Sequence, residues 1–266
     1  MTLRLGLYGL LGGLFTALLA LPAGHFAWSW LAGMVLTASL VPVARFGPRS
    51  PLAQFGFIAV ALVVVGLVCT LSEGVLFYPE IKAHWLRDFS GGTVMYLLTA
   101  AVLMALAKGL KLTATAPHAV ERRPVAWAIP LVLLSGLSYV VYYLIFGLIA
   151  FQFFTKQYYP HAQEQVAALG GWFWGYQWAR GTLMILAVLP IIYSLRLPRW
   201  QAALAVGVIL WLGGGCAGLL VPNTMMATRQ RYLHIGEIMT QNVSLGITAV
   251  LLLRKRERVR TGKESS

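Results

Sequence analysis

A histidine and a glutamate stand three positions apart near the end of the chain, as His234 and Glu237. In a helix such side chains lie on one face, so the pair has the spacing to bind one divalent metal ion, with Glu73 as a third ligand and water as the fourth. The pair can instead carry a proton or sense pH, because histidine titrates near neutrality. The motif His-x-x-Glu often occurs by chance, so the metal is the weaker interpretation, and no other cofactor is indicated.

Arg180 is the second candidate for chemistry, because its guanidinium is always charged and holds a carboxylate or phosphate by two parallel hydrogen bonds. In a helix it shares a face with Tyr176 and Gln177, since successive residues turn by about 100°. A charge inside a membrane-spanning helix costs about 2.5 to 3.5 kcal/mol on insertion scales, so it needs a partner. We expect Arg180 to pair with Glu73 or Glu237.

The segment around His234 and Glu237 has one polar face over most of its length. At about 100° per residue, a sector about 80° wide contains Gln230, His234, Glu237, Gln241, Ser244 and Thr248. Lipid excludes such a stripe, so this face must meet other helices or a water-filled cavity. Two more segments have mixed polar faces, one with Gly66, Cys69, Glu73, Phe77 and Glu80 and the other with Ser135, Tyr139, Tyr142 and Tyr143.

These faces predict a polar site inside the membrane on which four helices converge. We expect it to bind a ligand or to relay protons, and its candidate residues are Glu73, Tyr176, Gln177, Arg180, His234, Glu237 and Gln241. The alternative is that these residues only lock the helices together, as buried polar networks in bundles often do. A single ion pair would be enough to lock two helices together. This set contains two carboxylates, an arginine and a titratable histidine, and the surplus of ionisable groups favours a functional site.

The elements that must position these residues are membrane-spanning helices. The chain has 266 residues, of which 59% are hydrophobic and 11% charged, and this composition is too apolar for a soluble domain. Apolar stretches of about 20 residues recur along the chain without the alternation of barrel strands. The sequence therefore predicts an all-α polytopic integral membrane helix bundle of about eight transmembrane helices. The expected spans are residues 3–21, 25–44, 54–77, 91–110, 125–151, 172–195, 200–221 and 232–253.

Positive charge is distributed unevenly among the expected loops. On the side of both termini lie Arg4, Arg45, Arg49, Lys108, Lys111, Arg122, Arg123, Arg196, Arg199, Arg254, Lys255, Arg256, Arg258, Arg260 and Lys263. On the other side lie Lys82, Arg87, Lys156, Arg229 and Arg231. Because Lys and Arg accumulate in cytoplasmic loops, this pattern predicts a multipass protein of the plasma membrane with both termini in the cytoplasm.

The net charge of +13 follows from the same pattern and needs no nucleic-acid partner. We expect residues 1–253 to form one transmembrane domain and residues 254–266 to form a basic cytoplasmic tail. A basic cluster beside a membrane attracts anionic lipid headgroups at about 1 kcal/mol per residue. The expected partners are therefore the lipid bilayer and these headgroups, besides a small solute or lipid ligand.

Three classes of function remain open. The first is a binding or transport protein whose outward-facing pocket admits a small solute or lipid headgroup, with Arg180 holding an anionic group. The second is a membrane-embedded enzyme that acts at the outer leaflet, with or without a metal ion at His234 and Glu237. The third is a structural or assembly subunit without a site. Zinc bound to the purified protein would favour the enzyme. A solute flux that depends on pH would favour the transporter, and loss of a partner complex when the protein is deleted would favour the structural subunit.

Overall fold

The computed structural model describes residues 1–114, 120, 123–158 and 161–255, and in these residues it contains helices and no β-strand. The all-α class predicted from the sequence is confirmed. The α-helices are α1 (Thr2–Leu19), α2 (Phe26–Ser39), α3 (Val41–Phe46), α4 (Pro51–Val60), α5 (Cys69–Phe77), α6 (Pro79–Gly109), α7 (Val125–Ala150), α8 (Ala162–Leu169), α9 (Gly171–Ser194), α10 (Arg199–Trp211), α11 (Ala217–Leu220) and α12 (Thr228–Leu253). Between them lie the π-helical segments η2 (Ala61–Val68), η3 (Phe151–Thr155) and η5 (Leu212–Cys216), and the 3-10 turns η1 (Leu21–Ala23) and η4 (Lys156–Tyr158).

Seven helical stretches of the described chain are long and apolar enough to cross a membrane, which indicates a membrane protein. They are Thr2–Leu19, Phe26–Phe46, Pro51–Phe77, Pro79–Gly109, Ala126–Tyr158, Arg199–Leu220 and Thr228–Leu253. The expected span at residues 172–195 is not among them. This segment forms α9, whose 24 residues are long enough, but its first half carries Gln177, Arg180 and several tryptophans, which lower the mean hydropathy of the helix.

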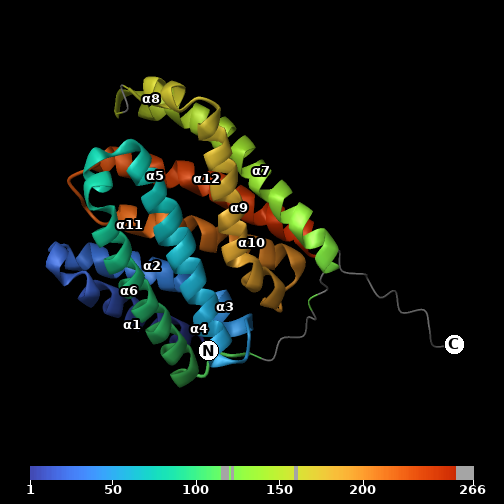
Figure 1. Ribbon diagram of the computed structural model, residues 1–266. Helices are drawn as coiled ribbons and strands as arrows, with labels where there is room; N and C mark the ends of the chain where they lie inside the picture. The colour runs from blue at the N-terminus through green and yellow to red at the C-terminus, as the bar shows by residue number, and fades with distance from the viewer. Residues whose placement is uncertain (115–119, 121–122, 159–160, 256–266) are drawn as a thin grey trace.

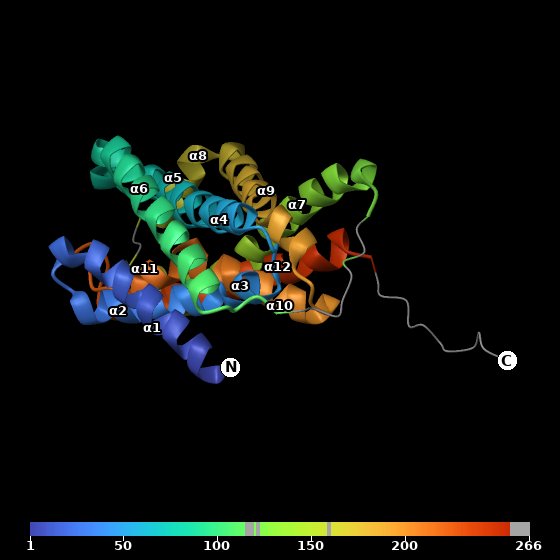
Figure 2. The same cartoon turned by 90° about the horizontal axis from the view of Figure 1, so that it is seen from below.

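The loops with most of the positive charge meet at one end of the bundle, which we call the basic end. It holds Arg45, Arg196, Arg199 and Arg254. The backbone N–H of Arg196 donates to the carbonyl oxygen of Phe46 at 3.0 Å, which joins the loop after α9 to the end of α3. Arg254 Nε donates to the carbonyl oxygen of Ile192 at 2.7 Å, which joins the end of α12 to α9. The N-terminus lies near this end in both views of the ribbon (Figures 1 and 2).

Arg254 belongs to the packed bundle rather than to an exposed tail. Its side chain is 4% exposed and donates to the carbonyl oxygens of Ile192, Leu195 and Leu197. The last carbonyls of a helix have no N–H of their own helix to bind, so Arg254 caps the end of α9. The rest of the predicted tail from residue 256 onward lies outside the described residues, and its contact with anionic headgroups stays a prediction.

Helix α6 is longer than the expected span of residues 91–110, because it begins at Pro79 and has 31 residues. A proline at the first helical position and an acid, Glu80, in the first turn both favour a helix start there. The charged residues from 80 to 88, which the sequence analysis places in a loop, are therefore helical. Glu80 is exposed on α6 and does not share the face of Glu73 on α5, which corrects the predicted polar face.

Glycines allow two close contacts between helices that carry the polar residues. At Gly181 on α9, an added Cβ would lie 2.5 Å from the Cβ of Tyr139 on α7. At Gly246 on α12, it would lie 2.5 Å from the Cα of Gly207 on α10. Small residues at such crossings let helix backbones approach closely, as is common in membrane proteins. These contacts hold α9 against α7 and α12 against α10.

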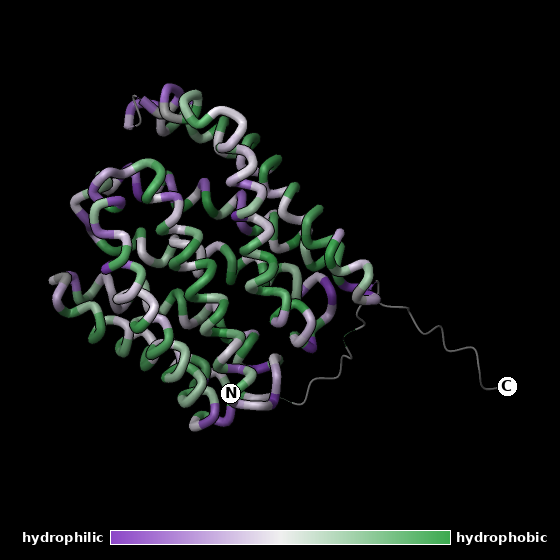
Figure 3. The backbone as a smooth tube through the Cα atoms, in the orientation of Figure 1, coloured by the Kyte–Doolittle hydropathy of each residue, from purple (hydrophilic) through white to green (hydrophobic). Residues whose placement is uncertain are grey.

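The apolar core runs through most of the bundle, with a large share of its side chains on α4, α9, α10 and α12. Its fully buried side chains include Ile58, Ile185, Ile192, Val206, Leu210, Leu245 and Leu253. Hydrophilic residues gather mainly towards the ends of the helices, while the middle of most long helices is hydrophobic (Figure 3). Polar residues of α5, α9 and α12 depart from this pattern, because they meet inside the bundle.

Candidate functional site

Arg180 forms an ion pair with Glu73, with 2.8 Å between Nη2 and Oε2. Of the two partners predicted from the sequence, Glu73 is the one found. The Arg180 side chain is 8% exposed and that of Glu73 is 23% exposed, so the pair is largely removed from solvent and lipid. Arg180 Nη1 also donates to the hydroxyl of Tyr139 at 2.8 Å. One guanidinium thus joins α5, α7 and α9.

Further polar groups surround this pair. The hydroxyl of Tyr143 donates to Glu73 Oε1 over a long 3.5 Å, and Arg180 Nη1 reaches Gln177 Oε1 at the same distance. The hydroxyls of Tyr176 and Ser72 lie 2.8 Å apart and bind α9 to α5. Tyr176 and Gln177, both predicted from the face they share with Arg180, are therefore part of the same network.

A second cluster of polar side chains lies on α12, where its members follow one another at intervals of about one helical turn along the polar face. His234 Nδ1 lies 3.2 Å from Glu237 Oε2, and Gln241 Nε2 donates to Glu237 Oε1 at 3.2 Å. Further along, the hydroxyls of Tyr142 and Thr248 lie 2.7 Å apart and join α12 to α7. The polar face of α12 therefore meets another helix, as predicted.

The two clusters are neighbours, and α7 contacts both of them. At Gly147, an added Cβ would lie 3.4 Å from Glu237 Oε1 and 3.6 Å from Gln241 Nε2, so this glycine allows the α12 side chains to approach. Tyr143 lies close enough to both Glu73 and Glu237 to interact with each electrostatically. The predicted convergence of four helices is confirmed, and they are α5, α7, α9 and α12.

The predicted metal site, with His234, Glu237 and Glu73 as ligands, does not form. Among the residues that the structure describes, no three His, Cys, Asp or Glu side chains are grouped so that they could hold a metal ion. The physical reason is that Glu73 pairs with Arg180, at 2.8 Å, so its carboxylate is already engaged by a cation. His234 and Glu237 remain together, but as a hydrogen-bonded pair.

Two buried donors beside Arg180 lack a protein partner among the described residues. They are Nε of Arg180 itself and Nε2 of Gln177, which is fully buried. Buried donors are nearly always hydrogen-bonded, to water if not to protein.

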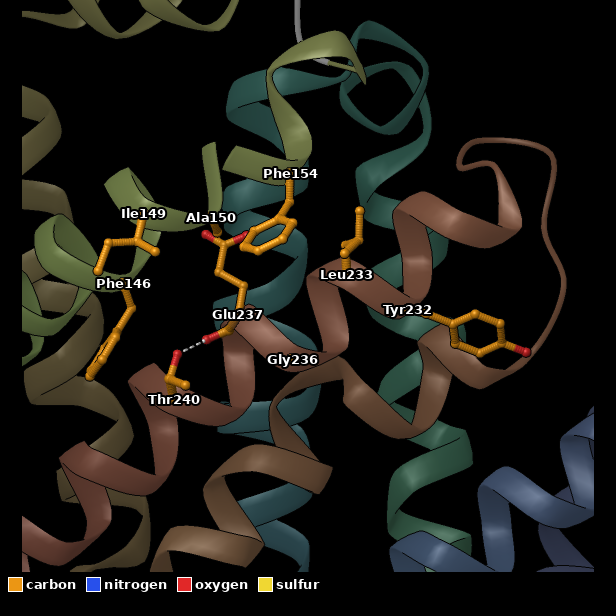
Figure 4. Close-up of a pocket in the computed structure, with 9 residues that line it drawn as sticks. All are labelled: Phe146, Ile149, Ala150, Phe154, Tyr232, Leu233, Gly236, Glu237 and Thr240. Atoms are coloured by element: carbon orange, nitrogen blue, oxygen red, sulfur yellow. Dashed lines mark hydrogen bonds between the residues drawn. The ribbon is translucent and has the colours of Figure 1, made fainter. Parts of the chain in front are cut away.

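A groove between α7 and α12 reaches the second cluster from the surface. Its volume is about 280 Å³, near the lower end of the range for ligand pockets. The lining residues, drawn in Figure 4, are Phe146, Ile149, Ala150, Phe154, Tyr232, Leu233, Gly236, Glu237 and Thr240. Glu237 is the only charged side chain among these nine. Sequence reasoning missed the groove, because its apolar residues are indistinguishable from those that face lipid.

Comparison with protein-family models, curated proteins and solved structures found no match. The site is therefore interpreted from its geometry alone. That geometry offers a neutralised ion pair that ties three helices together, and next to it a carboxylate at the inner wall of an apolar groove.

Proposed function

We propose that this membrane protein binds an amphiphilic molecule, taken from the bilayer, in the groove between α7 and α12. One observation carries the proposal: Glu237 is the charged side chain in a mostly apolar groove and at the same time belongs to the polar network inside the bundle. An amphiphile matches that surface, since its chain covers the apolar wall and its polar end reaches the carboxylate. The class is a binding or transport protein, the first of the three that the sequence leaves open.

The rim of the groove supports entry from lipid. Ile149 is 47% exposed, Phe154 53% and Tyr232 46%, all on the outer surface of a helix pair that is apolar enough to span a membrane. Large apolar side chains with such exposure lie against hydrocarbon in a bilayer. A ligand dissolved in the membrane therefore reaches Glu237 without crossing water.

In this proposal the two clusters have different roles. Arg180 is neutralised by Glu73 and nearly buried, so it locks helices and does not hold an anionic ligand, in contrast to the role the sequence suggests for it. Glu237 is the group that meets the ligand, and His234 and Gln241 orient its carboxylate. The enzyme alternative loses support because the expected three-residue metal site does not form.

Filling the groove should abolish binding. Gly236 lines the groove and has open space where a Cβ would be, so Gly236→Trp should project its ring into the groove without a clash at Cβ. We expect single-chain amphiphiles to raise the melting temperature of the purified wild-type protein, because a ligand that binds only the folded state stabilises it. The shift should vanish in Gly236→Trp.

The matched control is Gly9→Trp on α1, another helical glycine with open space around its Cβ position but outside the groove. It should respond to the amphiphiles as the wild-type protein does. A thermal shift of equal size in Gly236→Trp would contradict the proposal, as would the lack of any shift in the wild-type protein.

We further propose that the basic end lies in the cytoplasm and the groove in the outer half of the plasma membrane, as the positive-inside rule implies. This orientation requires α9 to cross the membrane in addition to the seven apolar stretches. Reporter fusions after Arg49, Arg123 and Arg199 should then be cytoplasmic, and fusions after Tyr78, Gly170 and Asn223 external. These external positions lie between helices, whereas Asp88 lies within α6 and would interrupt it. The reverse pattern, or one side for all six fusions, would contradict this orientation.

A further inference from the structure

We infer that the groove between α7 and α12 selects amphiphiles with a cationic, ammonium-type head. This inference rests on the proposed function and adds the charge of the ligand to it. Glu237 supplies the charge that selects the head, and the aromatic residues of the groove supply the surface around it.

The charges near the groove favour a cation. Glu73 and Arg180 neutralise each other at 2.8 Å, so the neighbouring cluster adds little net field. His234 and Gln241 each contact one oxygen of Glu237, and neither residue lines the groove, so Glu237 is the charged side chain that a ligand in the groove meets. An anionic head would meet this carboxylate without a free positive group among the lining residues, whereas an ammonium group would be attracted to it.

The composition of the groove supports the same head group. Phe146, Phe154 and Tyr232 are three of its nine lining residues, and Tyr142 stacks on Phe146 with 6.2 Å between ring centres. In Figure 4 the ring of Phe154 lies beside the carboxylate of Glu237, whereas the ring of Tyr232 points away from it. The faces of aromatic rings attract ammonium groups, most strongly where water is excluded. A carboxylate beside the ring of Phe154 therefore distinguishes a cation from a neutral hydroxyl head as well as from an anion.

The acceptor geometry leaves room for such a ligand. Each Glu237 oxygen has one hydrogen bond from another side chain, to Nδ1 of His234 and to Nε2 of Gln241, both at 3.2 Å. A carboxylate oxygen can accept two hydrogen bonds, so both oxygens keep capacity for a donor of the ligand. The side chain is 14% exposed, so it remains accessible from the groove.

The test uses alkyl compounds of one chain length that differ only in the head: a primary ammonium, a hydroxyl or a sulfonate. Thermal shifts of the purified protein in a nonionic detergent are measured over a range of concentrations. We expect the alkylammonium to bind the wild-type protein most tightly. In Glu237→Gln its affinity should fall about ten- to a hundredfold, as for loss of a charge-assisted hydrogen bond, and approach that of the alkanol.

The chain offers a matched control in His161 and Glu164, a second His-x-x-Glu pair with the same 3.2 Å contact but highly exposed and outside the groove. Glu164→Gln should leave alkylammonium binding unchanged. Equal binding of all three compounds by the wild-type protein, or preference for the sulfonate, would overturn the charge selectivity but retain the groove as a binding site. Failure of every compound to bind would instead overturn the proposed function itself.

Discussion

Replacing Arg180 by alanine should lower the free energy of unfolding by about 3 to 5 kcal/mol, the usual loss when one partner of a buried ion pair is removed. The substitution leaves Glu73 charged inside the bundle and also removes the donor to Tyr139. Adding Glu73→Gln should recover part of the loss, because the double variant no longer buries an unpaired carboxylate. The measurement is reversible unfolding of the purified variants in mixed micelles.

The same experiment distinguishes the two acids. Glu237→Gln should not rescue Arg180→Ala, since Glu237 is hydrogen-bonded to His234 and Gln241 rather than to Arg180. Strict additivity of Arg180→Ala and Glu73→Gln would contradict a direct energetic pairing. Rescue by Glu237→Gln of equal size would show that the two clusters act as one, against the separate roles proposed for them.

Gly181→Ala should destabilise the protein by about 1 to 3 kcal/mol, the range for overpacking a well-packed interior. The new methyl would lie 2.5 Å from Tyr139 Cβ and 3.0 Å from the carbonyl oxygen of Gly136, so α7 has to move away from α9. That movement also separates Tyr139 from Arg180. Thermal unfolding of the purified variant measures the loss.

Gly175→Ala on the same helix is the control, because no atom lies within 4 Å of its Cβ position. Alanine favours a helix over glycine by about 0.8 to 1 kcal/mol, so this variant should be as stable as the wild-type protein or more so. A similar loss of stability in both variants would mean that the helix, rather than its contact with α7, is sensitive to substitution.

Much of the fold can be predicted from this sequence because lipid imposes a simple rule on it. Helices must satisfy their own backbone and keep polar side chains away from hydrocarbon. The polar face of α12 and the pairing of Arg180 both follow from this rule, and both are found in the structure. The choice of Glu73 over Glu237 does not follow, because it depends on how α5, α9 and α12 are packed.

Other features depend on contacts that no local pattern contains. The hydropathy of α9 is low for a membrane-spanning helix, because its first half contains polar residues. How deeply Arg180 is buried depends on the packing of α9 against its neighbours, which the local sequence does not show. Arg254 looks like the first residue of a basic tail, yet it caps a helix that ended far earlier in the chain. The groove at Glu237 arises from two helices that meet side by side, so neither sequence segment alone reveals it.

The cap that Arg254 provides also constrains the order of events during synthesis. The hydrogen bond from Arg254 Nε to the carbonyl oxygen of Ile192 connects residues 62 positions apart. The end of α9 therefore lacks this donor until α12 has been synthesised. Chains are synthesised at about 5 to 20 residues per second, so α9 spends seconds in the membrane with those carbonyls open to water or to insertion factors. Completion of the basic end is therefore a late step in the synthesis of the chain, and a chain that ends before Arg254 would leave the end of α9 without this cap.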